Sequence, residues 1–252
     1  MHTFLRAVSL AALLALPATS FAQIRVLMSG GFAAPFEELL PEFQKATGIT
    51  VTATRGQSQG TGPTTIGAQL KRGVPSDMVI MAREGLDELI ADGKIVAKSD
   101  IDLAKTPLGL SVRAGAPKPD ISSVEAFKKT VLNAKGVTYP GSTTGIYLTT
   151  KLWQQLGIAN EVMPKISNTG VAAVAKGDAE IAIQPVSEII HAAGADFVGA
   201  IPKEIQYVSV FSAALVQGSP GQDAARKLIA FLSGPSAANA LKKSGMEPAA
   251  DR

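Results

Sequence analysis

Three hydroxyl residues follow a short apolar strand in the middle of the chain. The stretch Val137-Thr-Tyr-Pro-Gly-Ser-Thr-Thr-Gly-Ile-Tyr147 predicts a strand, a Pro-Gly turn and an amphipathic helix that begins near Gly145. The first N–H groups of a helix lack intrahelical partners and carry partial positive charge. With the hydroxyls of Ser142, Thr143 and Thr144, they predict an anion-binding site. The alternative is that Ser142 or Thr143 only caps the helix.

Glycines and arginines follow other predicted strands. Gly30 and Gly31 come directly after Ser29, and such glycines let backbone N–H groups approach an anion closely. Arg55 and Arg83 each follow a strand, and a guanidinium group matches a carboxylate with two parallel hydrogen bonds. We therefore expect all five residues to contact a ligand. The alternatives are a turn without ligand contact for the glycines, and a surface position or an ion pair within one lobe for the arginines.

Further polar side chains at strand ends and loops are candidates for ligand contact. Asn168 and Thr169 also have the alternative of capping the next helix. These further candidates are Ser58, Thr61, Asn168, Thr169 and Gln184.

The elements that position these residues alternate between strand and helix. Residues 23–29, the alternating segment 49–54 and the apolar run 78–82 predict strands, and the segments after them have helical spacing. This order predicts a doubly wound α/β sheet, in which ligands bind at the carboxyl ends of the strands. No Gly-x-Gly-x-x-Gly or P-loop motif is present, so a nucleotide site is not expected.

The alternation continues in a second unit that interrupts the first. We predict lobe I over residues 23–105 plus 206–252, and lobe II, inserted, over 106–205. Two chain crossings between the lobes would form a hinge.

Composition restricts the class of protein further. Residues 1–22 predict a secretory signal peptide cleaved after Ala22, and hence a periplasmic protein; no later apolar run is long enough for membrane insertion. The chain has no cysteine, which excludes disulfides and thiolate zinc sites. The formal net charge is +3 and the basic residues are scattered, so nucleic acid is not an expected partner.

Several segments, in order, resemble the molybdate-binding-protein family, whose members are type-2 periplasmic binding proteins. These segments are Ile24-Arg-Val-Leu, Phe43-Gln-Lys-Ala-Thr-Gly-Ile-Thr-Val51, Gly73-Val-Pro-Ser-Asp77, Gly145-Ile-Tyr147 and Leu228-Ile-Ala-Phe-Leu-Ser-Gly-Pro235. The resemblance implies two lobes that are each a doubly wound sheet flanked by helices, with a small anion bound between them. It also implies an ABC permease as partner if the protein only transports.

The predicted ligand positions depart from the family pattern. Gly31 stands where the family has a serine, the second loop contains Arg55, and Gln184-Pro185 replaces a tyrosine. A cationic side chain favours a carboxylate over molybdate. These changes resemble the aconitate isomerase branch of the family, which implies a cofactor-free enzyme that interconverts trans- and cis-aconitate by an allylic proton shift.

The base for such a shift stays open at this point. His191 is the one histidine after the leader and is the first candidate, with Tyr139 and the lysines and glutamates as others. Scattered carboxylates and one histidine predict no metal site. The alternative function is a non-catalytic solute-binding protein that delivers a carboxylate or a molybdate-like oxyanion to an ABC transporter.

Overall fold

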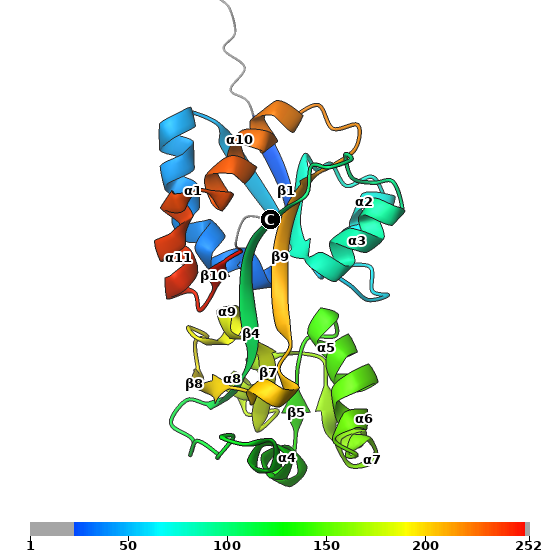
Figure 1. Ribbon diagram of the computed structural model, residues 1–252, viewed down its shortest axis with the longest axis vertical. Helices are drawn as coiled ribbons and strands as arrows, with labels where there is room; N and C mark the ends of the chain where they lie inside the picture. Colours follow the sequence, from blue (N-terminus) through cyan, green and yellow to red (C-terminus); the bar gives the residue numbers. More distant parts are fainter. Residues whose placement is uncertain (1–22, 250–252) are drawn as a thin grey trace, which may run out of the picture.

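The computed structural model describes residues 23–249 and confirms the expected two-lobe α/β fold (Figure 1). The expected signal peptide, residues 1–22, lies outside the described residues. Ten strands form one mixed sheet whose main path is β2-β1-β3-β9-β4-β7-β5-β6, with β8 and β10 also paired to β4. No helix within residues 23–249 has the length and apolar character needed to cross a bilayer.

Lobe I begins with three parallel strands and the helices between them. β3 is apolar throughout and β1 is mostly buried, as expected for strands inside the sheet, and Gly48 ends α1 in the left-handed conformation. The elements are β1 Gln23–Ser29, η1 Gly30–Phe32, α1 Ala33–Thr47, β2 Thr50–Gly56, α2 Ile66–Lys71, β3 Met78–Ala82 and α3 Arg83–Ala91.

Two long antiparallel strands, β4 (Ile101–Arg113) and β9 (Val208–Leu215), run side by side between the lobes (Figure 1). The first part of β4 pairs with β9, and from Leu108 onward it pairs with the strands of lobe II. At this change of partner, Gln206 accepts a hydrogen bond from the Leu108 N–H at 2.7 Å and donates to the Leu108 carbonyl at 3.1 Å. The predicted limits of the lobes, residues 23–105 plus 206–252 and residues 106–205, stay a prediction.

Lobe II contains shorter elements around parallel strands β7, β5 and β6. Residues 143–155 form one helical run with a π-type segment, η2, in its middle. The elements are α4 Val124–Asn133, β5 Val137–Thr138, α5 Thr143–Tyr147, η2 Leu148–Leu152, α6 Trp153–Gln155, α7 Ala159–Val162, η3 Met163–Lys165, β6 Ile166–Ser167, α8 Val171–Lys176, β7 Ile181–Pro185, α9 Val186–Ile189, β8 Ala195–Ala200 and η4 Lys203–Ile205.

The chain then returns to lobe I, where α11 packs beside α1. Its last elements are α10 Gln222–Ser233, η5 Pro235–Ala237, α11 Ala238–Lys243 and β10 Glu247–Pro248. Phe43 of α1 packs on Phe231 of α10 with ring centroids 5.5 Å apart. Each lobe has its own apolar core, which in lobe II centres on the fully buried Trp153 between Phe127 and Tyr139.

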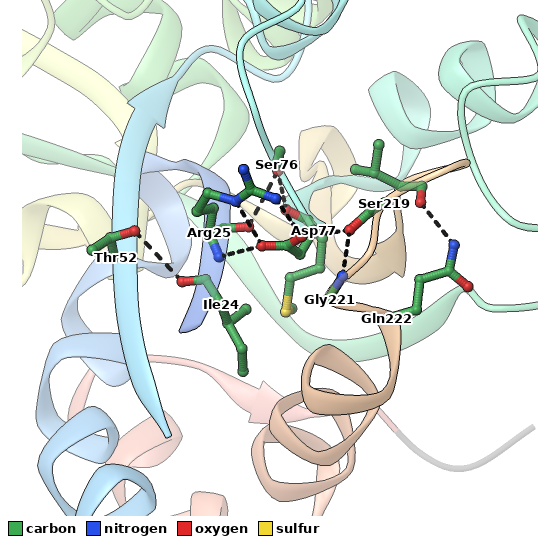
Figure 2. Close-up of polar contacts among 10 residues, drawn as sticks. Ile24, Arg25, Thr52, Ser76, Asp77, Ser219, Gly221 and Gln222 are labelled. Carbon is green, nitrogen blue, oxygen red and sulfur yellow. Dashed lines mark hydrogen bonds and ion pairs between the residues drawn. The ribbon is translucent and has the colours of Figure 1, made fainter. Parts of the chain in front are cut away.

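An ion pair between the partly exposed Arg25 and the buried Asp77 fixes the edge of lobe I at which the parallel strands begin (Figure 2). The Arg25 backbone N–H and Nε donate to Asp77 Oδ2 at 2.8 and 2.9 Å, and Arg25 Nη2 donates to Oδ1 at 2.8 Å. Ser219 donates a further hydrogen bond to Oδ1. The cluster therefore ties β1, the start of β3 and the loop before α10 together.

Candidate functional site

The carboxyl ends of strands from both lobes meet around one cavity of about 190 Å³. Four strand-to-helix junctions contribute to it, namely those from β1 to η1, β3 to α3, β5 to α5 and β7 to α9. The lining residues are Ser29, Gly30, Gly56, Gln57, Ser58, Ala82, Pro140, Ser142, Thr143, Thr144, Pro185, Glu188, Ser209 and Phe211. Of the residues that the sequence predicts for the site, the structure brings together Ser29, Gly30, Ser58, Ser142, Thr143 and Thr144.

The hydroxyl cluster of Ser142, Thr143 and Thr144 lies in the wall of this cavity. Ser142 occupies the N-cap position of α5, but its side chain makes no capping hydrogen bond; its Oγ accepts one from the Gln59 N–H of lobe I at 3.1 Å. Thr143 Oγ1 is buried and has no hydrogen-bond partner among the described residues. A buried unpaired hydroxyl is costly, so Thr143 Oγ1 has a donor and an acceptor to offer a ligand.

Ser58 and the loop after β2 form the lobe I side of the cavity. Ser58 Oγ accepts a hydrogen bond from the Ala82 N–H at 2.9 Å, at the start of α3. The buried side chain of Gln69 donates to the carbonyls of Arg55 and Thr64 at 3.2 and 3.0 Å and so closes the loop. These hydrogen bonds fix the conformation of the loop, so that Gly56, Gln57 and Ser58 line the cavity.

Glu188 is the only ionisable side chain in the lining, and it is not among the residues predicted for the site. Its Oε2 accepts a hydrogen bond from Gln184 Nε2, while Gln184 Oε1 accepts one from the Val171 N–H. Burial raises the pKa of Glu188, and the bond from Gln184 and the positive charge of Arg55 act in the opposite direction. Gln184 itself does not line the cavity; it orients the carboxyl group that does.

Gly31 lies beside the cavity and serves a packing role. A Cβ atom at Gly31 would lie 2.0 Å from Cζ of Phe211, so only glycine leaves room for this ring. Phe211 in turn lines the cavity. Gly31 therefore supports an aromatic side chain that forms the wall, and its predicted contact with a ligand stays a prediction.

The two arginines lie outside the cavity lining. The Arg83 side chain donates to Asp102 and, at 2.9 Å, to Asp100, so it occupies the ion pair within one lobe that was the alternative reading. Arg55 is half exposed and pairs with Glu37. Its charge still acts on Glu188, so the end of β2 brings one cation near the site without placing it in the wall.

The remaining candidates also lie outside the lining. Thr61 faces a different surface pocket, and Asn168 and Thr169 are exposed on the loop before α8. His191 is exposed, and its Nε2 lies 2.8 Å from the Lys243 carbonyl of lobe I, which makes it a contact between lobes. Tyr139 is buried in the core of lobe II, where its hydroxyl accepts a hydrogen bond from the indole N–H of Trp153.

Other contacts hold the lobes together around the cavity. The Tyr207 hydroxyl donates to Glu84 Oε1 of α3, and the Tyr207 ring stacks on Tyr147 of α5 with centroids 4.8 Å apart. Burial raises the pKa of Tyr207 and the Glu84 carboxylate raises it further, so the hydroxyl keeps its proton. Through Tyr207, α3 of lobe I and α5 of lobe II are therefore held beside the cavity that both lobes line.

A larger cavity of about 510 Å³ lies within lobe II alone. It is formed at the end of β4 and the start of β7, which is the edge opposite to the hydroxyl cluster, and its wall includes Pro117, Pro119 and Ala134. The C-terminal ends of α4 and α8, at Asn133 and Gly177, border this cavity, and helix C-termini carry partial negative charge, so the smaller cavity is the better anion site. Within residues 23–249, no three histidine, aspartate or glutamate side chains are grouped to hold a metal ion.

Three of the lining residues that were not predicted lie where a strand ends or where the next helix begins. Ala82 and Pro185 are the last residues of β3 and β7, and Glu188 lies in the first turn of α9, directly after β7. The signal that could have found Glu188 is its place in the first turn after a buried strand. Ser209 and Phe211 come from β9, which crosses between lobes, and no local motif marks them.

Comparisons with known proteins agree with this architecture. The sequence pattern of the bacterial extracellular solute-binding protein family matches residues 24–247. An aconitate isomerase from Pseudomonas sp. is 36% identical over 229 residues, which cover 89% of this chain and 87% of that protein.

Solved structures are similar in fold at lower identity. The periplasmic molybdate-binding protein of Azotobacter vinelandii has a TM-score of 0.73 and 20% identity, with 91% of this chain and 100% of that chain covered. A sulfate-binding protein of Mycobacterium tuberculosis has a TM-score of 0.66 and 18% identity, with 91% and 88% covered.

Proposed function

This chain belongs to the bacterial extracellular solute-binding protein family, and from that premise we propose that it binds a small polycarboxylate between its lobes and interconverts trans- and cis-aconitate. The observation that carries the proposal is the cavity between the lobes, whose lining combines hydroxyls and helix N-termini with one carboxyl group, in a chain 36% identical to an aconitate isomerase. Its volume of about 190 Å³ is below the roughly 300–1,000 Å³ of sites for drug-sized ligands, which supports a small compound.

The lining supplies what binding of carboxylates requires. Helix N-termini on both sides offer backbone N–H donors and partial positive charge, and Thr143 offers an unpaired hydroxyl. The same donors would stabilise the extra negative charge that develops on a substrate carboxylate when a proton leaves the neighbouring carbon. Closure of the lobes removes water, which strengthens these interactions.

The proposal is tested by thermal shift followed by turnover. Saturating trans-aconitate, at about 100 times the dissociation constant, should stabilise the protein by about 2.7 kcal/mol. Conversion of trans- to cis-aconitate, followed by chromatography, then separates an enzyme from a carrier. Binding without turnover at micromolar protein would refute the isomerase.

A matched pair of variants tests the location of the site. Thr143→Val removes the unpaired hydroxyl in the cavity, whereas Thr150→Val makes the same change at an exposed position of the same helical run. A hydrogen bond to a charged group contributes about 1.5–3 kcal/mol, so T143V should weaken binding by roughly 10- to 150-fold. T150V should bind like the wild type. Equal binding by all three proteins would place the ligand elsewhere.

A second candidate function is transport of an oxyanion without catalysis. The observation in its favour is that no cationic side chain lines the cavity, since neutral donors alone suit a compact anion such as molybdate or sulfate, and proteins named for these two ligands share the fold. Thermal shifts with molybdate, sulfate, citrate and trans-aconitate in parallel would separate the two candidates. We further propose export to the periplasm, with an ABC permease as partner if the protein only transports.

A further inference from the structure

The carboxyl group of Glu188 lies in the cavity in an arrangement suited to moving a proton. One oxygen, Oε2, is held by Gln184, which is itself fixed by the Val171 N–H. The other oxygen, Oε1, makes no hydrogen bond within the described residues and lies 3.7 Å from the point where a Cβ on Gly30 would stand. The carboxyl group therefore extends from lobe II to the lobe I wall, across the space a ligand would occupy.

The rest of the lining contains no rival for this role. The other lining side chains are hydroxyls, an amide, a phenyl ring and small apolar groups, none of which exchanges a proton readily near neutral pH. Tyr139 is buried in the core and His191 lies at the junction of the lobes. Of the bases that the sequence left open, a glutamate is the one placed at the cavity.

We propose that Glu188 is the general base and acid of the allylic shift, an inference that rests on the proposed isomerase function. The Glu188 carboxylate takes one proton from the methylene carbon of aconitate. The electron pair of that C–H bond forms the new double bond to the central carbon. The electron pair of the old double bond takes a proton from the Glu188 carboxyl group at the former vinyl carbon. Glu188 returns to its starting form, and no oxidant or reductant is consumed.

Raised proton affinity supports this role. Burial raises the pKa of Glu188, and a carboxylate substrate beside it would favour the protonated form further. A stronger base takes a proton from carbon more readily, and general acid–base catalysis contributes roughly 10²- to 10⁴-fold to rates.

The decisive variant is Glu188→Gln, which keeps the shape and one hydrogen-bond acceptor for Gln184. We expect E188Q to lose at least about 100-fold in kcat while it still binds propane-1,2,3-tricarboxylate, a saturated analogue that cannot isomerise, in a thermal shift assay. Glu188→Asp keeps a carboxyl group in a displaced position and should retain measurable turnover. Glu161→Gln, the same change at an exposed glutamate of lobe II, should match the wild type.

The outcomes separate this inference from the proposed function. If the wild type turns over and E188Q does so at a similar rate, Glu188 is not the base. If His191→Gln abolishes turnover instead, the inference is equally refuted in favour of the histidine. If the wild type binds the tricarboxylate but never isomerises trans-aconitate, the proposed function fails and the role of Glu188 fails with it.

A measurement on the wild type covers the case in which E188Q does not fold. Trans-aconitate deuterated at its methylene carbon should give a product that carries part of that deuterium at the former vinyl carbon, because one half-buried carboxyl group takes and returns it. Complete exchange with water would overturn the assignment of both steps to a single carboxyl group.

Discussion

Replacement of Asp77 by asparagine should destabilise the protein in a pH-dependent manner. The Asp77 carboxyl group is fully buried. Burial alone raises its pKa, but hydrogen bonds from the Arg25 side chain, Ser219 and the Arg25 backbone (Figure 2) outweigh this and lower the pKa to about 2. The ordinary value is 3.8. Because the folded-state pKa is lowered, the contribution to stability is complete well above the ordinary pKa and is lost as pH falls toward the folded-state value.

The magnitude follows from the difference between the two pKa values. The Asp77 carboxylate contributes about 2 kcal/mol to the free energy of unfolding at pH 7 and about 1 kcal/mol at pH 3, and this contribution nearly vanishes at pH 2. Urea unfolding of the wild type and D77N at these pH values measures the difference directly. D77N should be about 2 kcal/mol or more less stable at pH 7, with a gap that narrows as the pH falls.

The control is Asp87→Asn, at a carboxylate that is 62% exposed and 3.5 Å from Arg83. An exposed ion pair contributes about 0–1 kcal/mol, so D87N should be nearly neutral. A D77N defect of constant size between pH 7 and pH 3 would show that packing, and not the charge of the carboxylate, is what the cluster around Arg25 requires.

Three more changes have outcomes that the structure specifies. Gly31→Ala puts a methyl group against the ring of Phe211 and should cost about 1–3 kcal/mol, measured by thermal melting. Trp153→Ala empties the centre of the lobe II core and should cost about 3–5 kcal/mol, measured by circular dichroism in urea. Tyr207→Phe removes the hydrogen bond to Glu84, whose other oxygen is already buried without a partner, and should cost about 1–3 kcal/mol in urea unfolding.

Matched observations make these three expectations refutable. Gly30→Ala, where the nearest atom would be 3.7 Å from the new methyl group, should leave the melting temperature nearly unchanged, and an equal loss in G30A and G31A would contradict the packing explanation. If W153A were as stable in urea as the wild type, the stability of lobe II would not depend on the Trp153 side chain. Y207F with wild-type stability would show that the contact between Tyr207 and Glu84 is not made in solution.

The sequence predicts the fold well because alternation and apolar runs report burial directly. Residues 78–82 are apolar throughout and form the fully buried β3, and Gly48 ends α1 as its position indicates. Short or amphipathic elements are less visible. β5 contains only two residues, Val137–Thr138, and β8, Ala195–Ala200, was not predicted because it contains alanines, a glycine and an aspartate.

The site could be predicted only where a local motif marks it. Ser142, Thr143 and Thr144 follow a strand and begin a helix, and all three line the cavity. Arg83 has the same sequence position after a strand, but three aspartates, including Asp100 and Asp102, attract its side chain away. Such competition between partners depends on residues that are distant in the chain, so spacing alone cannot reveal it.

The pairing of β4 with β9 has a consequence for how the chain is divided. Pro107 and Val208 are partners in this ladder, so the hundred residues between them, which include all of lobe II after the crossing, leave and re-enter lobe I at a single point. A short turn from Pro107 to Val208 would close the lobe I sheet as an ordinary hairpin. Lobe II is thus an insertion in the lobe I sheet. If this insertion were exchanged between relatives, the ends of β1 and β3 would still line the binding cavity, whereas the hydroxyl cluster and Glu188 would be replaced.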